Sequence, residues 1–119
     1  MITLTEIAFS GPARPIDGYG PGFFRVDDKV LHGAVLVTPG GARVWAGFED
    51  CAALLALAGQ IDVLLLGMGR SVAYADPDLV AQLDAVGIGV EPMDSPAAAR
   101  SYNVLLSEGR RIAAALLPV

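Results

Sequence analysis

The chain has 119 residues, of which 54% are hydrophobic and 18% charged. This is the length of one domain, because two cores of half the size would each be marginal, and the composition excludes a disordered chain. The net charge of −5, the single lysine and the scattered arginines argue against a nucleic-acid partner, which requires clustered cations to replace phosphate counterions.

The sequence also predicts where the protein resides. Residues Met1 to Glu6 lack the basic start of a secretion signal. Every apolar run is shorter than the roughly 20 residues that a membrane-spanning helix needs. The one cysteine, Cys51, cannot form an internal disulfide. We therefore expect a cytoplasmic protein with no direct membrane span.

The first half of the chain predicts antiparallel strands. Prolines and glycines alternate through the first 22 residues, which indicates an extended lead-in with short edge strands, one of them over Thr3–Phe9. From Phe23 onward, apolar and β-branched runs are separated by turn sequences, a pattern typical of a hairpin or meander. The expected strands are Phe23–Val26, Val30–Leu31, Gly33–Thr38 and Ala42–Ala46, with turns at Asp27–Asp28 and Pro39–Gly41.

The second half predicts alternating helices and strands. Apolar residues recur at helical spacing from Phe48 to Ala58. The run Val63–Leu66 is apolar without alternation, which is typical of a strand covered on both faces. Two later helices each begin with a capping residue followed by proline. The expected elements are a helix over 76–86 capped by Asp76, a strand over 88–92, a helix capped by Ser95 and ended by Gly109, and a strand over 110–117.

A glycine loop directly after the buried strand is the first candidate site. It consists of Gly67, Met68, Gly69, Arg70 and Ser71. Glycines at such a position let the backbone approach a ligand, and free amides there can hold an anion. The dinucleotide fingerprint would need a third glycine where Val72 stands, and the Gly-Lys-Ser/Thr of a P-loop is absent. Two alternatives remain: a tight turn, and a binding loop for an unidentified ligand that Tyr74 would flank.

Arg100 and Asn103, on one polar strip of the last predicted helix, form the second candidate site. If that helix begins on the same side of the sheet as the glycine loop, Arg70 and Arg100 could converge on a carboxylate or phosphate. The alternative is that each arginine pairs with a nearby acid, such as Asp94 or Glu91.

The residues offer little for catalysis or metal binding. His32 is the only histidine and Cys51 the only cysteine, and the latter falls on the apolar stripe of a predicted helix. The paired carboxylates have explanations as turns and helix starts. We therefore expect no catalytic residue, no metal and no cofactor.

Four segments together resemble a known family. They are Phe24–Val26, Gly33–Val37, Val63–Gly69 and, as the most specific block, Asp94–Leu116. They are similar to a small Mth-type α/β domain family of unknown function, which includes a mitochondrial assembly factor for respiratory complex I and an adipogenesis-associated protein of animals. The resemblance covers the chain from about Ile7 to its end.

The resemblance carries expectations about fold and function. It implies a three-layer single α/β domain over residues 1–119, in which a mixed central sheet has helices on one side and an antiparallel β-hairpin layer from the N-terminal half on the other. It implies that no enzymatic activity should be assumed. From the mitochondrial relative it implies a helper that contacts complex I subunits, here as a free-standing cytoplasmic member without a transit peptide.

Three hypotheses follow. The leading one is a non-enzymatic protein-interaction domain that assists assembly of a complex I-like respiratory membrane complex and has protein partners. The rival is a small-anion or small-molecule binding protein or enzyme, in which Gly67 and Gly69 supply amides and Arg70 and Arg100 anchor the ligand. The third is a homo-oligomer in which exposed apolar residues, such as an outward Phe23 or Phe24, form subunit contacts.

Overall fold

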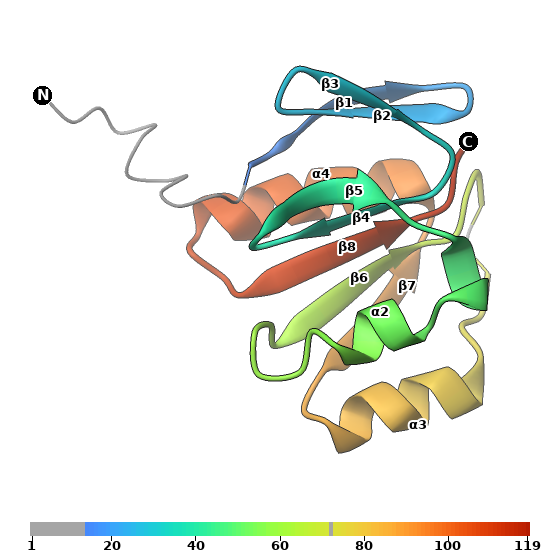
Figure 1. Cartoon of the computed structure of the whole chain (residues 1–119), viewed down its shortest axis with the longest axis vertical. Coiled ribbons are helices and arrows are strands. Elements are labelled where there is room, and N and C mark those ends of the chain that lie inside the picture. The colour runs from blue at the N-terminus through green and yellow to red at the C-terminus, as the bar shows by residue number, and fades with distance from the viewer. Residues whose placement is uncertain (1–13, 72) are drawn as a thin grey trace, which may run out of the picture.

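The computed structural model describes residues 14–71 and 73–119 as one α/β domain with two sheets (Figure 1). The strands are β1 (Ile16–Gly20), β2 (Phe23–Val26), β3 (Lys29–His32), β4 (Val35–Thr38), β5 (Gly41–Val44), β6 (Val63–Gly67), β7 (Gly89–Met93) and β8 (Ile112–Leu116). The helices are η1 (Gly47–Glu49), α2 (Ala52–Leu55), α3 (Pro77–Ala85) and α4 (Ser95–Ser107). The strand expected over Thr3–Phe9 lies outside the described residues.

The N-terminal half forms the expected antiparallel layer. β1, β2 and β3 make a three-stranded antiparallel sheet in that order. Asp27 and Asp28 connect β2 to β3 with φ angles of 53° and 63°, the left-handed pair that suits a two-residue hairpin and that Asp tolerates better than most residues. Phe24 points inward and is fully buried, whereas Phe23 is half-buried on the outer face beside His32.

The second sheet is mixed and has the order β5-β4-β8-β6-β7. β6 pairs in parallel with both β7 and β8, while β4 pairs antiparallel with β5 and β8. β7 is an edge strand, which is where its Pro92 can be accommodated without breaking a ladder bond. The expected mixed central sheet is therefore confirmed, and so is the antiparallel first half.

Each face of this sheet is covered by a separate apolar cluster. On one face β8 contributes Ile112, Ala114 and Leu116, which pack with residues of α4 and of the three-stranded sheet. On the other face it contributes Ala113 and Ala115, which pack with residues of α2 and α3. The alternation of inward residues along a strand explains how one segment serves both clusters.

The distribution of the helices differs from the expectation that they share one side. α4 lies on the face that carries the three-stranded sheet, and α2 and α3 lie on the opposite face (Figure 1). The reason is the strand order: α3 connects β6 to a neighbour on one side, and α4 then connects β7 back across to β8 on the other side of β6. Right-handed crossovers in opposite directions must use opposite faces.

Local signals predicted the start of α3 correctly and the start of α4 to within one residue. Asp76 caps α3 as predicted, with its carboxylate accepting the Asp78 N–H at 3.0 Å. The cap predicted for α4 is wrong by one residue, because the Asp94 carboxylate accepts the Ala97 N–H at 2.7 Å and Ser95 is the first helical residue.

The continuous helix predicted over 48–58 is also wrong. Asp50 interrupts it with a non-helical backbone (φ −122°, ψ 67°), and its carboxylate accepts the Ala53 N–H at 3.2 Å. The result is a single turn, η1, followed by the four-residue α2.

Candidate functional site

The glycine loop lies at the carboxyl end of β6, where the connections from neighbouring strands lead to opposite faces of the sheet. It follows β6, whose connection leads to α3 on one face, and it borders the end of β7, whose connection leads to α4 on the other face. In open α/β sheets the crevice between two strands with such opposed connections is the usual ligand-binding place.

Ser95 fills this crevice. A Cβ on Gly67 would lie 2.7 Å from the Ser95 Oγ and 2.9 Å from its Cα, so only glycine permits α4 to begin so close to β6. The Ser95 hydroxyl is fully buried; it accepts the Gly69 N–H at 2.9 Å and donates to the Leu117 carbonyl at 2.6 Å. We call Ser95 with these two hydrogen bonds the serine latch.

The backbone of the glycine loop also forms hydrogen bonds with the end of β7 and the start of α4. The Met68 N–H donates to the Met93 carbonyl at 2.8 Å, and the Ser95 N–H donates to the Gly69 carbonyl at 2.7 Å. Gly69 has a φ of +91°, which favours glycine. The amides of Met68 and Gly69 are therefore engaged within the protein in this structure, so an anion would have to displace them.

The predicted arginines, Arg70 and Arg100, lie on the surface of the domain. Arg70, Ser71 and Arg100 are all solvent-exposed, and none of them lines either of the two hollows described below. Arg70 belongs to the loop, whereas Arg100 lies one and a half turns into α4.

Asn103 is occupied by the protein itself. Its side-chain oxygen accepts the Ile16 N–H at 2.7 Å, and its side-chain nitrogen donates to the Ile16 carbonyl at 2.8 Å. These two bonds reproduce the pairing of a neighbouring strand and fasten the bulged start of β1 to α4. Asn103 thus connects the three-stranded sheet to α4 and is half-buried rather than freely exposed.

A hollow of about 340 Å³ lies beside the loop, on the α3 side. We call it the β6 cleft. It is lined by Phe48, Cys51, Met68, Tyr74, Asp76 and Leu79. Of these residues, Met68 belongs to the binding loop predicted from the sequence, and Tyr74 was expected to flank that loop.

The walls of the β6 cleft are held by contacts behind them. The Phe48 ring meets the ring of buried Trp45 edge to face, with centroids 5.4 Å apart. The Trp45 indole N–H donates to the Asp50 carbonyl at 3.0 Å, and the Cys51 thiol donates to the Phe48 carbonyl at 3.2 Å. The cleft is therefore formed before any ligand arrives.

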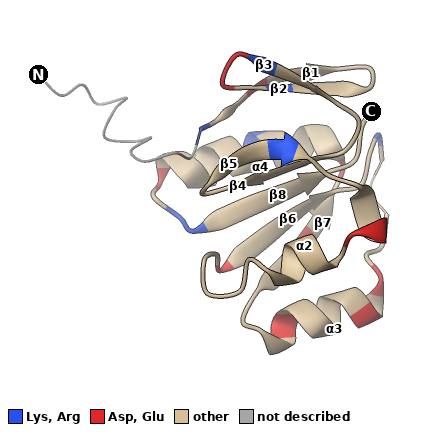
Figure 2. Cartoon of the chain, viewed as in Figure 1, with Lys and Arg blue, Asp and Glu red and all other residues tan. Residues whose placement is uncertain are grey.

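The outer part of the cleft is more accessible and acidic. Phe48 is 38% exposed and the Tyr74 side chain is fully exposed. Glu49 and Asp78 are exposed and adjoin the lining residues Phe48 and Leu79 in the sequence. Figure 2 shows acidic residues on the elements that carry them, η1 and α3. The sequence explains these acids as helix starts, whereas the position of Asp76 in the lining of a hollow depends on tertiary packing that no local pattern reveals.

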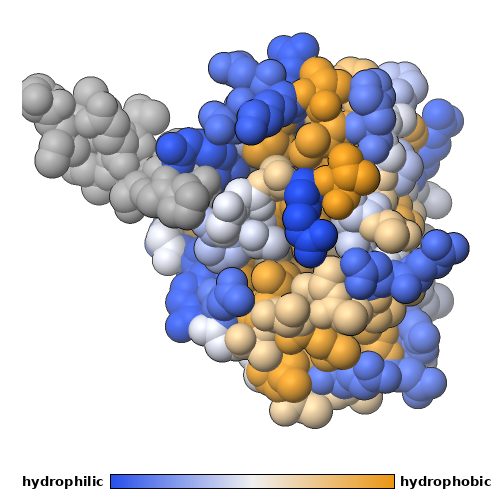
Figure 3. Space-filling model, viewed as in Figure 1, coloured by the Kyte–Doolittle hydropathy of each residue, from blue (hydrophilic) through white to orange (hydrophobic). Residues whose placement is uncertain are grey.

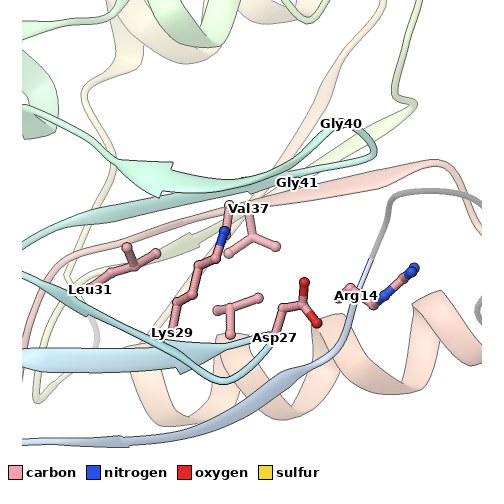
Figure 4. A pocket seen from close by; sticks show the side chains of 9 residues that line it. Arg14, Asp27, Lys29, Leu31, Val37, Gly40 and Gly41 are labelled. Atoms are coloured by element: carbon pink, nitrogen blue, oxygen red, sulfur yellow. The ribbon is translucent and has the colours of Figure 1, made fainter.

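A second hollow, of about 250 Å³, lies between the β2–β3 hairpin and the β4–β5 hairpin (Figure 4). Lys29 extends from β3 across the gap toward Val37 and Gly41, with Asp27 beside it and Arg14 at one end. None of these residues was selected from the sequence. Their proximity arises from the stacking of two sheets that are separate in the chain.

Two structural features are missing from the described residues. Within residues 14–71 and 73–119, no group of three His, Cys, Asp or Glu residues is placed to hold a metal ion. Over the same residues, none of the helices has both the length and the apolar character needed to pass through a bilayer.

Comparison with known proteins identifies relatives across nearly the whole fold. The family described as "Protein of unknown function (DUF498/DUF598)" matches residues 16–117. An uncharacterized protein of Rhodobacter capsulatus is 55% identical over 96% of this chain and 91% of its own length.

Two further relatives have more informative names. NADH dehydrogenase [ubiquinone] 1 alpha subcomplex assembly factor 3 of Danio rerio is 32% identical over 87% of this chain, which spans 63% of that protein. A crystal structure described as an outer membrane protein from Bartonella henselae is 35% identical, covers 93% of this chain and 98% of its own, and superposes with a TM-score of 0.84. The resemblance seen in the sequence, including its assembly-factor member, is confirmed.

Proposed function

This chain belongs to the DUF498/DUF598 family of proteins of unknown function, and from that membership we propose that it is a non-enzymatic protein-interaction domain that helps a respiratory, complex I-like membrane complex to assemble. The observation that carries the proposal is the similarity to an NADH dehydrogenase assembly factor over 87% of the chain. An assembly factor acts by contacting other proteins, so protein partners are part of the same proposal. A shared fold alone would not suffice, since one fold hosts many functions.

The surface described above suits such a role. The β6 cleft and its exposed aromatic side chains offer an apolar contact area with a polar border, the usual composition of a protein-binding patch. The predicted site residues of the glycine loop, Gly67, Met68, Gly69, Arg70 and Ser71, lie next to it. We propose this edge of the domain as the contact surface, and the cytoplasm as the place of action.

Complementation tests the proposal in a cell. In a Rhodobacter capsulatus strain that lacks the 55%-identical relative, we expect lower NADH dehydrogenase activity in the membranes and less fully assembled complex on a native gel. We expect this chain to restore both. Unchanged assembly in the deletion strain, or restoration of activity without restoration of assembly, would contradict the proposal.

Affinity purification gives an independent test. The tagged chain, recovered under gentle conditions, should bring down subunits or assembly factors of the respiratory complex. Recovery of the chain alone would favour the homo-oligomer, which sedimentation of the pure protein would then reveal as a stable dimer or larger species.

The rival function, binding of a small molecule, is favoured by the volume of the β6 cleft, which falls within the range of small-molecule sites, roughly 300–1,000 Å³. A thermal-shift screen with nucleotides, carboxylic acids, sulfate and organic amines separates it from the leading proposal. A ligand at about 100 times its dissociation constant would add roughly 2.7 kcal/mol of stability, which such a screen detects easily. A reproducible shift with one chemical class would support the rival.

A further inference from the structure

We infer that the β6 cleft binds an extended segment of a partner protein in which an apolar anchor residue stands next to Arg or Lys. The inference rests on the proposed function and specifies the partner chemistry at one surface. It concerns the six residues that line the cleft and the two acids, Glu49 and Asp78, on the elements beside it.

The interior of the cleft accounts for the apolar anchor. Met68 forms part of the lining next to the sheet, and Leu79 and Phe48 come from opposite walls. A single Leu, Met or Phe side chain from a partner would exchange water for contact with these three residues, which is how anchor residues contribute to binding. The walls are preorganised by the Trp45–Phe48 stacking and the α3 cap, so little ordering opposes binding.

Tyr74 indicates that the occupant extends beyond the hollow. Its side chain is fully exposed although it belongs to the lining, so its ring offers contact area outside the enclosed volume. A small molecule held within the cleft would leave most of that ring in water. A polypeptide segment that crosses the rim would cover it, and tyrosine is among the residues that most often dominate protein interfaces.

The charge around the cleft specifies the flanking residues of the partner. Glu49 is exposed on η1, and Asp78 is exposed in the first turn of α3. Asp76 lines the cleft, and one of its oxygens is occupied by the α3 cap. No arginine or lysine lines the cleft, and Arg70 of the adjoining loop is one exposed cation against these three acids. A positively charged flank would therefore find complementary charge on both sides, whereas an acidic flank would be repelled.

An unbiased peptide selection tests the inference. The purified full chain is used to select from a phage-displayed library of random dodecapeptides, and the enriched peptides are synthesised with a fluorescent label for anisotropy titrations. We expect the enriched sequences to combine Leu, Met or an aromatic residue with adjacent Arg or Lys. Enrichment of neutral or acidic sequences, or of none, would overturn the inference.

Variants then locate the binding. Tyr74→Ser should weaken the selected peptide at least about fivefold without affecting folding, since the side chain is fully exposed. The double variant Glu49→Gln with Asp78→Asn should weaken it about threefold or more and flatten its dependence on salt. The matched control is Val104→Ser on α4, a 56% exposed apolar residue away from the cleft, which should leave binding unchanged. Equal affinity for the Tyr74→Ser variant and the parent chain would place the peptide elsewhere and refute the cleft.

The single tryptophan supplies a second readout. Trp45 touches Phe48 from behind, so a tryptophan-free peptide that occupies the cleft should change its emission along the same binding curve. Failure here remains distinct from failure of the proposed function. If the Tyr74→Ser variant still restores assembly of the respiratory complex in Rhodobacter capsulatus, the proposed function stands and this assignment of its contact surface falls.

Discussion

Replacing Ser95 with alanine should destabilise the domain strongly although it removes only one oxygen atom. The serine latch joins three elements: the start of α4, the loop after β6 and the residue after β8. In the Ser95→Ala variant the buried Gly69 N–H would lose its acceptor, and the Leu117 carbonyl would lose its donor.

The magnitude follows from the surroundings of the two partners. A buried donor without an acceptor costs about 1–3 kcal/mol, and the partly buried carbonyl, which water can reach, costs roughly 1 kcal/mol. The expected loss is therefore about 2–4 kcal/mol in the free energy of unfolding. With an unfolding entropy near 2.1 cal/mol/K per residue, 119 residues lose roughly 4 °C of melting temperature per kcal/mol, so we expect a fall of about 8–16 °C.

Urea and thermal unfolding followed by circular dichroism would measure this loss. The matched control is Ser107→Ala at the end of the same helix, where the exposed hydroxyl donates to the Val104 carbonyl at 2.7 Å. Its effect should stay within about 0.5 kcal/mol. Similar small shifts in both variants would refute the argument that the latch holds the crevice closed.

Two further predictions concern α4. The Tyr102 hydroxyl is buried and has no hydrogen-bond partner among the described residues, so Tyr102→Phe should raise stability at pH 7 by about 1 kcal/mol, measured from urea midpoints. Burial also raises the pKa of Tyr102 from 10.0 to about 12. Between pH 10 and 12 the folded state therefore keeps a proton that the unfolded chain releases. The free energy of unfolding of the parent chain should fall by up to about 3 kcal/mol over this range. Tyr102→Phe should remove that loss. If the free energy of unfolding of the variant fell with pH as steeply as that of the parent chain, this explanation would be contradicted. Asn103→Ala should cost about 1–2 kcal/mol and accelerate amide exchange in β1 roughly 5- to 30-fold, with β8 unaffected. Uniform acceleration in both strands would contradict the role of Asn103 as the link between β1 and α4.

The parts of the fold that the sequence predicted well have local causes. Asp76 followed by proline specifies the start of α3 from adjacent residues, and the Asp27–Asp28 turn is defined by its own backbone. The buried strand β6 also followed from periodicity, because an apolar run without alternation indicates a strand covered on both faces. The mixed central sheet was what the family resemblance implied. The prediction of a continuous helix over 48–58 was wrong because the carboxylate of Asp50 accepts the Ala53 N–H and interrupts an otherwise helical pattern.

Sequence patterns predicted a loop that borders the β6 cleft, but not the other side chains that form the cleft or the contacts around it. Ser95 reaches partners 26 and 22 residues away, and Asn103 reaches Ile16 across 87 residues, so neither role leaves a local pattern. The β6 cleft likewise combines side chains from η1, the loop after β6 and α3. Exposed apolar side chains such as Tyr74 can be recognised as contact residues only when their neighbours in space are known.

The apolar surface visible on this side of the molecule extends over α2 and α3 below the sheet (Figure 3). These two helices and their ends carry exposed alanines, among them Ala52, Ala56 and Ala81. Single exposed apolar residues are ordinary on protein surfaces. The charged border distinguishes the β6 cleft from this surface.

The position of β8 has a consequence for biosynthesis. β8 is the last strand in the chain, yet it occupies the centre of the five-stranded sheet, between β4 and β6. Until residues 112–116 leave the ribosome, the β4–β5 hairpin and the β6–β7 pair each present an unpaired strand edge. Such edges are templates for association with other chains, so a nascent or truncated molecule without this strand should depend on chaperones far more than the finished one.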